Sequence, residues 1–208
     1  MVTFETTIFE KDWEVILKTG YLEKMIARCD YGFQRKVLIV NNVKNRKDVE
    51  SVCQSKKRDG IINDFYFVED YDKEVLDFFD IDPLSFRGGR IYSMPPLVGI
   101  YLCETRYLLR FTGDSIIIND HPWIDESISL MDGEIISAAP KVDFYDERNP
   151  IRIIGDFQVT KAFSDQCFLA DTDVFKKKIY NYTSEYTSNY PAYAGQPFER
   201  RIADFMTT

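Results

Sequence analysis

The sequence has few of the residues that build metal centres and disulfide scaffolds. It holds one histidine, His121, and four cysteines, Cys29, Cys53, Cys103 and Cys167, which lie far apart and form no C-x-x-C pair. This spacing favours neither a disulfide framework nor a zinc site. We therefore expect the cysteines to be buried thiols in a reducing compartment, and His121 to serve in a loop or at a helix entry.

Acidic residues outnumber basic ones, so the chain lacks an excess of positive charge. The chain has 26 Lys and Arg against 34 Asp and Glu, a net charge of −8, which argues against binding to nucleic acid or to an anionic membrane surface. No window approaches the ~18 apolar residues of a membrane span, and the start, MVTFETTIFEKDWEVIL, lacks the basic region of a signal peptide. A cytoplasmic protein is expected, with no nucleic-acid partner and no transmembrane segment.

Apolar residues alternate between strand-like and helix-like spacing along the chain. Strands are predicted over 2–9, 36–43, 64–71, 107–111 and 134–142, and helices over 11–29, 44–60, 73–81, 93–106, 123–133 and 198–206. The pattern is looser over 143–157, a loop with a strand, and over 165–178, a strand that runs into a helix start. This order predicts an α/β fold with a mostly parallel central sheet flanked by helices. The 208 residues suit a single domain, with a nucleotide-binding half over 2–118 and a more irregular half over 119–208.

Two segments carry special backbone residues. The glycines and mixed charges of DPLSFRGGR, residues 82–90, suggest a loop that moves over a site. Pro95 and Pro96 begin the apolar run after it, and helices tolerate proline only in their first turn. A helix is therefore expected to begin just before these prolines.

The predicted strands end in polar residues. In an open parallel sheet, ligands bind outside the carboxyl ends of the strands. Loops are polar in any case, which explains single instances, but two long apolar runs here stop at carboxylates. Asn41 and Asn42 favour capping of the next helix, and Glu69 suits either a ligand or the dipole of the following helix. The polar ends are Thr6 and Thr7, Asn41 and Asn42, Glu69 and Asp70, and Thr112 with Asp114.

The order TTIF, helix, VLIVNNV, helix, FYFVEDY, helix, YLLRFTGDSI resembles the nucleotide-binding half of a GT-A glycosyltransferase over residues 2–142. In that fold a D-x-D motif holds Mn²⁺ or Mg²⁺ on the diphosphate of a nucleotide-sugar donor. Thr112-Gly113-Asp114 stands in its place and keeps only the last acid. The resemblance implies a Rossmann-like enzyme that uses a UDP- or GDP-linked sugar and a saccharide acceptor, with Asp114 as metal ligand. Surface polysaccharide synthesis in bacteria is a further expectation of this kind. A homo-oligomeric state is a separate expectation, because tyrosine-rich loops also form subunit interfaces.

The same resemblance implies roles for the other strand ends. Thr6 and Thr7 would lie beside the nucleotide, and Glu69 or Asp70 would accept an N–H of the base. The other implied contacts are Arg87 or Arg90 with the diphosphate, and Thr112 with a ribose hydroxyl or a metal-bound water.

An inverting transfer also needs a base for the acceptor hydroxyl. The resemblance places it at a helix start in the second half of the chain, where AGQPFERRIADFM supplies Glu199. Asp165 and Asp171, in FSDQCFLAD, compete for the role. Many such enzymes have a late histidine as a further metal ligand; after His121 this chain has none, so the ligand is absent or the chain ends before it.

Other functions stay open. A nucleotidyltransferase would need a glycine-rich, basic loop after the first strand, which FETTIFEKDW lacks. The half-complete acid motif favours a noncatalytic GT-A-like binding domain as the main alternative. Taken alone, Gly113-Asp114 also suits the turn of a hairpin between YLLRF and SIII. The tyrosine-rich segment over 180–193 suits either sugar stacking or a subunit interface.

Overall fold

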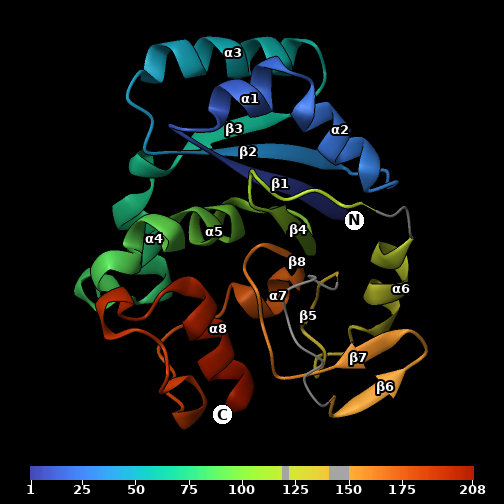
Figure 1. Cartoon of the computed structure of the whole chain (residues 1–208), viewed down its shortest axis with the longest axis vertical. Coiled ribbons are helices and arrows are strands. Elements are labelled where there is room, and N and C mark those ends of the chain that lie inside the picture. The colour runs from blue at the N-terminus through green and yellow to red at the C-terminus, as the bar shows by residue number, and fades with distance from the viewer. Residues whose placement is uncertain (119–121, 141–149) are drawn as a thin grey trace.

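A twisted sheet runs through the middle of the molecule (Figure 1). The structure is a computed structural model, and it describes residues 1–118, 122–140 and 150–208. Within these ranges the sheet has six strands in the order β3-β2-β1-β4-β8-β5. Four strands are parallel, and β8 runs antiparallel between β4 and β5. Their bounds are β1 Val2–Phe9, β2 Arg35–Asn41, β3 Asp64–Phe67, β4 Tyr107–Phe111, β5 Ser137–Ala138 and β8 Cys167–Asp171.

Helices cover both faces of this sheet, which confirms the predicted α/β class with a mostly parallel sheet (Figure 1). One core packs α1, α2, α3 and α6 on the sheet, and the other packs α4, α5, α7 and α8. A hairpin of β6, Arg152–Ile154, and β7, Phe157–Val159, stands apart. The helices are α1 Trp13–Lys18, α2 Tyr21–Arg28, α3 Arg46–Arg58, α4 Asp72–Phe79, α5 Arg90–Leu102, α6 Trp123–Leu130, α7 Thr172–Phe175 and α8 Phe198–Thr207.

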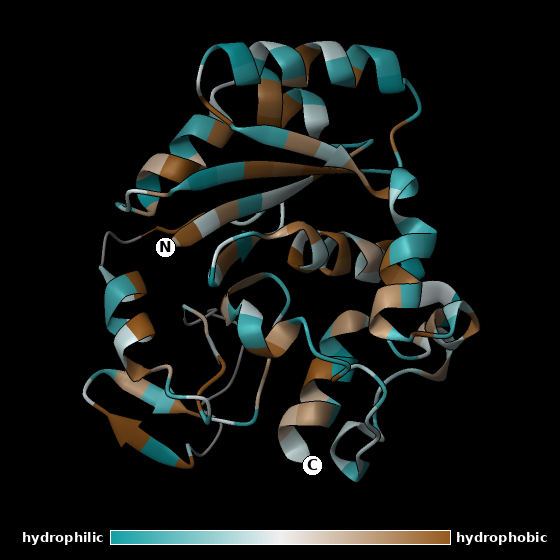
Figure 2. Ribbon diagram, turned by 180° about the vertical axis from the view of Figure 1, so that it is seen from behind, coloured by the Kyte–Doolittle hydropathy of each residue, from teal (hydrophilic) through white to brown (hydrophobic). Residues whose placement is uncertain are grey.

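Strand alternation decides which side chain faces which helix layer. In β1, Phe4 and Ile8 enter the core with α1 and α2, while Glu5 lies on the other face, against Gly99 of α5. The helices differ in hydropathy according to how deeply they are buried. Figure 2 shows α5 apolar along most of its length and α3 largely hydrophilic, because α5 is enclosed and α3 lies at the outside.

The predicted helix over 11–29 is two helices. Gly20, between α1 and α2, has φ 79°, a conformation that L side chains rarely adopt. The chain turns there, so the apolar residues of both short helices reach the same core.

The prolines of α5 lie in its second turn, because the helix begins at Arg90; the predicted placement in the first turn is wrong. Pro95 has no N–H, so the carbonyl of Ile91, four residues earlier, lacks its helical partner. The Asn41 side chain supplies one, donating from Nδ2 to Ile91 O at 2.8 Å. Asn41 therefore does not cap the next helix; Asn45 does, accepting from Asp48 N.

The segment over 82–90, predicted as a mobile loop, is mostly the 3-10 helix η2, Pro83–Gly89, held by the chain before α8. Gln196 N donates to Ser85 O at 2.9 Å, and Arg87 donates to Ala192 O at 2.6 Å. Arg201, 1% exposed, donates to Tyr180 O at 2.6 Å and also to the Ser85 hydroxyl. These contacts hold η2, which leads into α5, against α8 and the segment before it.

The hairpin alternative for YLLRFTGDSIII is wrong. Ser115 N donates to Thr112 O at 3.0 Å, so a tight turn is present at Gly113-Asp114. However, the antiparallel partner of β4 is β8, and residues 115–118 form no strand. The strand predicted over 134–142 reduces to β5 within the described residues.

All four cysteines are buried and unpaired with one another, as expected. Burial raises the pKa of Cys29 and of Cys53 to about 12. None of the described helices is long and apolar enough to cross a membrane.

Candidate active site

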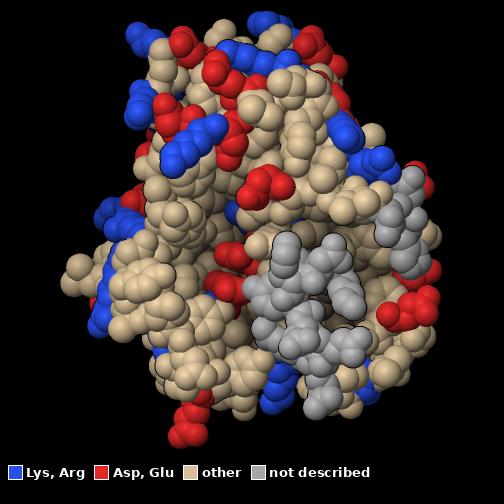
Figure 3. All heavy atoms as spheres, in the orientation of Figure 1, with Lys and Arg blue, Asp and Glu red and all other residues tan. Residues whose placement is uncertain are grey.

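Two chain segments meet at the carboxyl end of β4. Thr112 N donates to Gln166 O at 2.8 Å, which places the residues before β8 beside those after β4. Because β8 is antiparallel, its beginning lies at the same sheet edge as the ends of β1 to β4. Figure 3 shows a hollow in the middle of this face, where acidic side chains gather near the region in which α5, α8 and the β8 segment meet in Figure 1.

A buried charge pair lies under this edge. Arg110 pairs with Glu5, and the two side chains are 4% and 1% exposed. Gly99 makes room for the pair, since a Cβ at this residue would lie 1.6 Å from Glu5 Oε2. Arg110 also donates to the Thr7 hydroxyl at 2.8 Å, while Thr6 donates to Phe111 O at 3.1 Å. Both threonines are buried in the sheet, so the resemblance-based contact with a nucleotide stays a prediction.

Asp165 lies close enough to Arg110 for their charges to interact. Burial raises the pKa of Asp165, and the nearby Arg110 charge opposes that rise. Burial likewise lowers the pKa of Arg110 to about 10, with Asp165 acting in the opposite direction. A carboxylate with a raised pKa at the sheet edge has the character of a general acid or base.

Asp171 lies at the other end of β8. It pairs in register with Tyr107, the first residue of β4, and caps α7 by accepting from Asp173 N at 3.0 Å. Arg106 donates to its carboxylate at 3.2 Å. The structure therefore separates Asp171 from the sheet edge that holds Asp165.

The Thr112-Gly113-Asp114 segment packs on the start of α1. A Cβ at Gly113 would lie 2.5 Å from Thr7 O, 2.6 Å from Ile16 Cδ1 and 3.6 Å from Asp12 Oδ2. Asp114 is exposed, and its charge helps to raise the pKa of Asp12, after the larger effect of burial. The Thr112 hydroxyl bonds that of Ser115 at 2.7 Å.

A cavity of about 370 Å³ opens at the ends of β2 and β3, lined by residues 42–44 with Arg46, Phe67 and Glu69. Glu69 accepts from Asn42 N at 2.8 Å, and the Arg46 guanidinium lies 3.9 Å from the centre of the Phe67 ring. Asp70 forms a bidentate pair with Arg46, which holds the pKa of Asp70 below its usual value. Glu69 lines the cavity, whereas both oxygens of Asp70 are engaged by Arg46.

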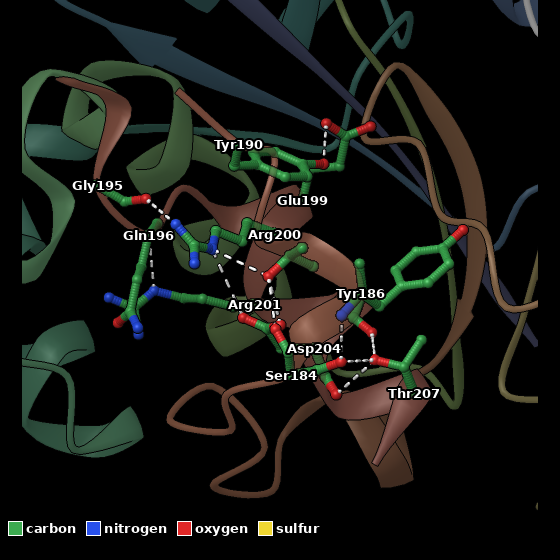
Figure 4. A network of polar contacts seen from close by, with 12 residues as sticks. Ser184, Tyr186, Tyr190, Gly195, Gln196, Glu199, Arg200, Arg201, Asp204 and Thr207 are labelled. Carbon is green, nitrogen blue, oxygen red and sulfur yellow. Dashed lines mark hydrogen bonds and ion pairs between the residues drawn. The ribbon is translucent and has the colours of Figure 1, made fainter. Parts of the chain in front are cut away.

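Arg90 and Glu199 lie at the beginnings of two helices, α5 and α8. Arg90 begins α5 and pairs with Asp72. Glu199, in the first turn of α8, accepts from the Tyr190 hydroxyl at 2.9 Å (Figure 4). Phe198 N donates to the Ser93 hydroxyl at 3.0 Å, so the start of α8 is fixed to α5 beside Glu199.

The rest of the network in Figure 4 fixes Arg200. Arg200 donates to Gly195 O at 3.0 Å and to the Thr187 hydroxyl at 3.2 Å, and Thr187 in turn donates to the buried Asp204 at 2.6 Å. The Arg200 guanidinium lies 5.8 Å from the centre of the Tyr190 ring. The tyrosine that bonds Glu199 is therefore itself packed against a fixed cation.

The donor set at this edge fits a divalent ion only if the ion uses few protein ligands. Within 1–118, 122–140 and 150–208, no three His, Cys, Asp or Glu side chains are grouped to hold a metal. Asp114 and Asp12 are carboxylates, and a hard ion such as Mg²⁺ binds through one or two carboxylates with waters and substrate phosphates. The chemistry of the pair thus fits the ion that the fold family implies. His121 lies outside the described residues.

Known proteins provide an independent comparison. A scan against protein-family models and a search of curated proteins find no match. A search of solved structures finds the galactosyltransferase LgtC in complex with donor and acceptor sugar analogues, with a TM-score of 0.50 and 13% identity, over 97% of this chain and 68% of that one. An active-site mutant of LgtC matches with a TM-score of 0.50 and 13% identity, over 98% of this chain and 69% of that one. Mouse xyloside xylosyltransferase 1 in its apo form matches with a TM-score of 0.51 and 9% identity, over 100% of this chain and 81% of that one.

The chain has the GT-A fold. This confirms the resemblance read from the strand and helix order, as far as the fold is concerned. In the GT-A frame, the structure brings Asp114, Asp165 and the strand-end threonines to one sheet edge. Sequence reasoning missed Asp12, which it placed inside a helix; its position just before Trp13, as the residue that precedes α1, was the available signal.

Proposed function

We propose that this GT-A chain transfers a sugar from a nucleoside-diphosphate donor to a saccharide acceptor. The observation that carries the proposal is the contact between the segments that hold Asp114 and Asp165, where Thr112 N donates to Gln166 O at the carboxyl edge of the sheet. Open α/β sheets bind ligands at this edge. The structural neighbours are named as a galactosyltransferase and a xylosyltransferase, which supports glycosyl transfer as the reaction class. We further propose that the chain acts in the synthesis of a bacterial surface polysaccharide.

In this proposal, the cavity at the ends of β2 and β3 receives the nucleobase. Glu69 lines it and can accept an N–H from the ring, while the guanidinium of Arg46 stays stacked on Phe67. Arg90, at the start of α5, is the candidate contact for the diphosphate, which would compete with Asp72 for its guanidinium. Asp114 would hold Mn²⁺ or Mg²⁺, which when bound stabilises the negative charge on the departing diphosphate.

The acceptor hydroxyl must lose a proton as it attacks the sugar. Asp165 and Glu199 are the candidate bases, and they come to the edge from different elements. Burial raises the pKa of Asp165, which makes its carboxylate a better proton acceptor than an exposed one. Glu199 is oriented by the hydrogen bond from Tyr190.

Calorimetric titration with UDP and GDP, each with and without Mn²⁺, tests the donor site. Binding of one nucleotide at micromolar to low-millimolar concentration is expected, and Glu69→Gln should weaken it. Asp59→Asn, an exposed acid at the end of α3, serves as the control. If neither nucleotide bound at millimolar concentration, the glycosyltransferase proposal would be refuted.

A panel of UDP- and GDP-sugars with release of the nucleotide as readout tests the base. Glu199→Gln and Asp165→Asn should each be measured for turnover and for nucleotide affinity. The true base, when replaced, lowers turnover by about 10²- to 10⁴-fold and leaves nucleotide affinity unchanged. Nucleotide binding without any turnover by the wild type would favour the noncatalytic GT-A-like binding domain.

A further inference from the structure

The motif position before Gly113 lacks a carboxylate. Thr112 offers a neutral hydroxyl there, and this hydroxyl is already bonded to that of Ser115 at 2.7 Å. Asp114 alone would leave an ion with a single charged protein ligand. The chain therefore either holds the ion weakly or takes a second carboxylate from elsewhere in the fold.

Gly113 shows which part of the chain lies against the motif. The Cβ that any other residue would place here comes within 2.6 Å of two atoms, Thr7 O and Ile16 Cδ1, and within 3.6 Å of Asp12 Oδ2. The absence of a side chain at Gly113 lets the end of β4 rest directly on the start of α1. Asp12 and Asp114 become neighbours for this reason, although 102 positions of sequence separate them.

The two oxygens of Asp12 have different surroundings. Oδ1 accepts from Phe9 N at 2.6 Å, which fixes the side chain, whereas Oδ2 is the oxygen nearest Gly113. In the part of the chain that the structure describes, no Lys or Arg forms an ion pair with Asp12 or Asp114. A half-buried carboxylate next to a second one, without a cation from the protein, is a costly arrangement that a divalent ion would compensate.

We propose that Asp12 supplies the second carboxylate for the divalent ion, so that Asp12 and Asp114 replace the two acids of a D-x-D motif. The inference rests on the proposed function, because the donor diphosphate would complete the coordination. Asp12 acts from the start of α1, outside the motif itself. A pattern search restricted to residues 112–114 would therefore undercount the ligands of this site.

Titration of the full chain with Mn²⁺ alone tests Asp12 and Asp114 as metal ligands. The electron paramagnetic resonance signal of free Mn²⁺ reports how much of the ion remains unbound. Asp12→Asn keeps an acceptor for Phe9 N and should weaken Mn²⁺ binding at least about tenfold, the lower end of the loss seen when even an outer partner of a ligand is removed. Asp114→Asn should do the same. Glu14→Gln, two residues further along α1 and paired with Lys18 on the surface, should bind Mn²⁺ like the wild type.

Thermal melting without metal shows whether each variant is folded; if Asp12→Asn is not, Asp12→Ser provides a second short acceptor at the same place. Wild-type affinity in a folded Asp12 variant, or no Mn²⁺ binding by the wild type, would overturn the inference. Repeating the titration with UDP or GDP separates it from the proposed function. If the nucleotide binds equally well with and without Mn²⁺, the donor site is supported and Asp12 is refuted as a metal ligand. If Mn²⁺ binds but neither nucleotide does, the role of Asp12 is supported and the proposed donor site is refuted.

Discussion

Replacing Arg110 by methionine tests the buried charge pair under the sheet edge. The side chains of Arg110 and Glu5 are 4% and 1% exposed, so Arg110→Met leaves a carboxylate in the interior without its counter-charge. Breaking a buried pair in this way costs about 3–5 kcal/mol. With a urea m value of about 2 kcal/mol per molar, the midpoint of unfolding should fall by roughly 2 M.

The double variant Glu5→Leu with Arg110→Met sharpens this prediction. A hydrophobic replacement of a whole buried pair is often neutral or stabilising, so the double variant should recover most of the lost stability. Arg46→Met is the matched control, because the Arg46 and Asp70 side chains are 48% and 46% exposed, and an exposed pair contributes about 1 kcal/mol or less. A midpoint shift for Arg110→Met no larger than that of the control, or a double variant as unstable as the single one, would refute the reasoning.

Three further predictions concern packing, thiols and pH. Gly113→Ala should lower the free energy of unfolding by about 1–3 kcal/mol, since its Cβ meets Thr7 O at 2.5 Å; unchanged urea unfolding would contradict the packing. Cys29 and Cys53, with pKa values of about 12, should stay unreactive toward Ellman's reagent at pH 8 in the folded protein and react on unfolding; rapid reaction when folded would contradict their burial. Arg46 lowers the pKa of Asp70, so the stability that Asp70→Asn removes should be fully present at pH 7 and should decline as the pH falls below the usual Asp pKa toward the lowered native pKa. A stability difference between wild type and Asp70→Asn that stayed the same throughout acidification would contradict this.

The regular first half of the fold was accessible from the sequence because its signals are local. β1, β2 and β4 are runs of apolar and β-branched residues, and their ends were placed within about two residues of the observed ones. The shared polar ends of parallel strands follow from topology, so a site at this edge could be predicted before its contacts were known.

The rest depends on contacts between distant parts of the chain. That β8 inserts antiparallel beside β4 cannot be read from CFLAD, which suits either direction. The two prolines in the second turn of α5 contradict the local rule for helices, and only the remote Asn41 makes them acceptable there. Asp12 and Asp114 meet because of the packing of Gly113, which no spacing along the sequence reveals.

The hydrogen bond from Asn41 to Ile91 links two positions that would be studied separately in a mutational scan. Asn41 has this task because residue 95 is proline and leaves the carbonyl of Ile91 open. Pro95→Ala would return an N–H that can donate to the carbonyl of Ile91, so the helix would no longer need the hydrogen bond from Asn41. Tolerance at position 41 thus depends on the residue at position 95, so related sequences should vary the two together, and engineering that changes one without the other loses the compensation.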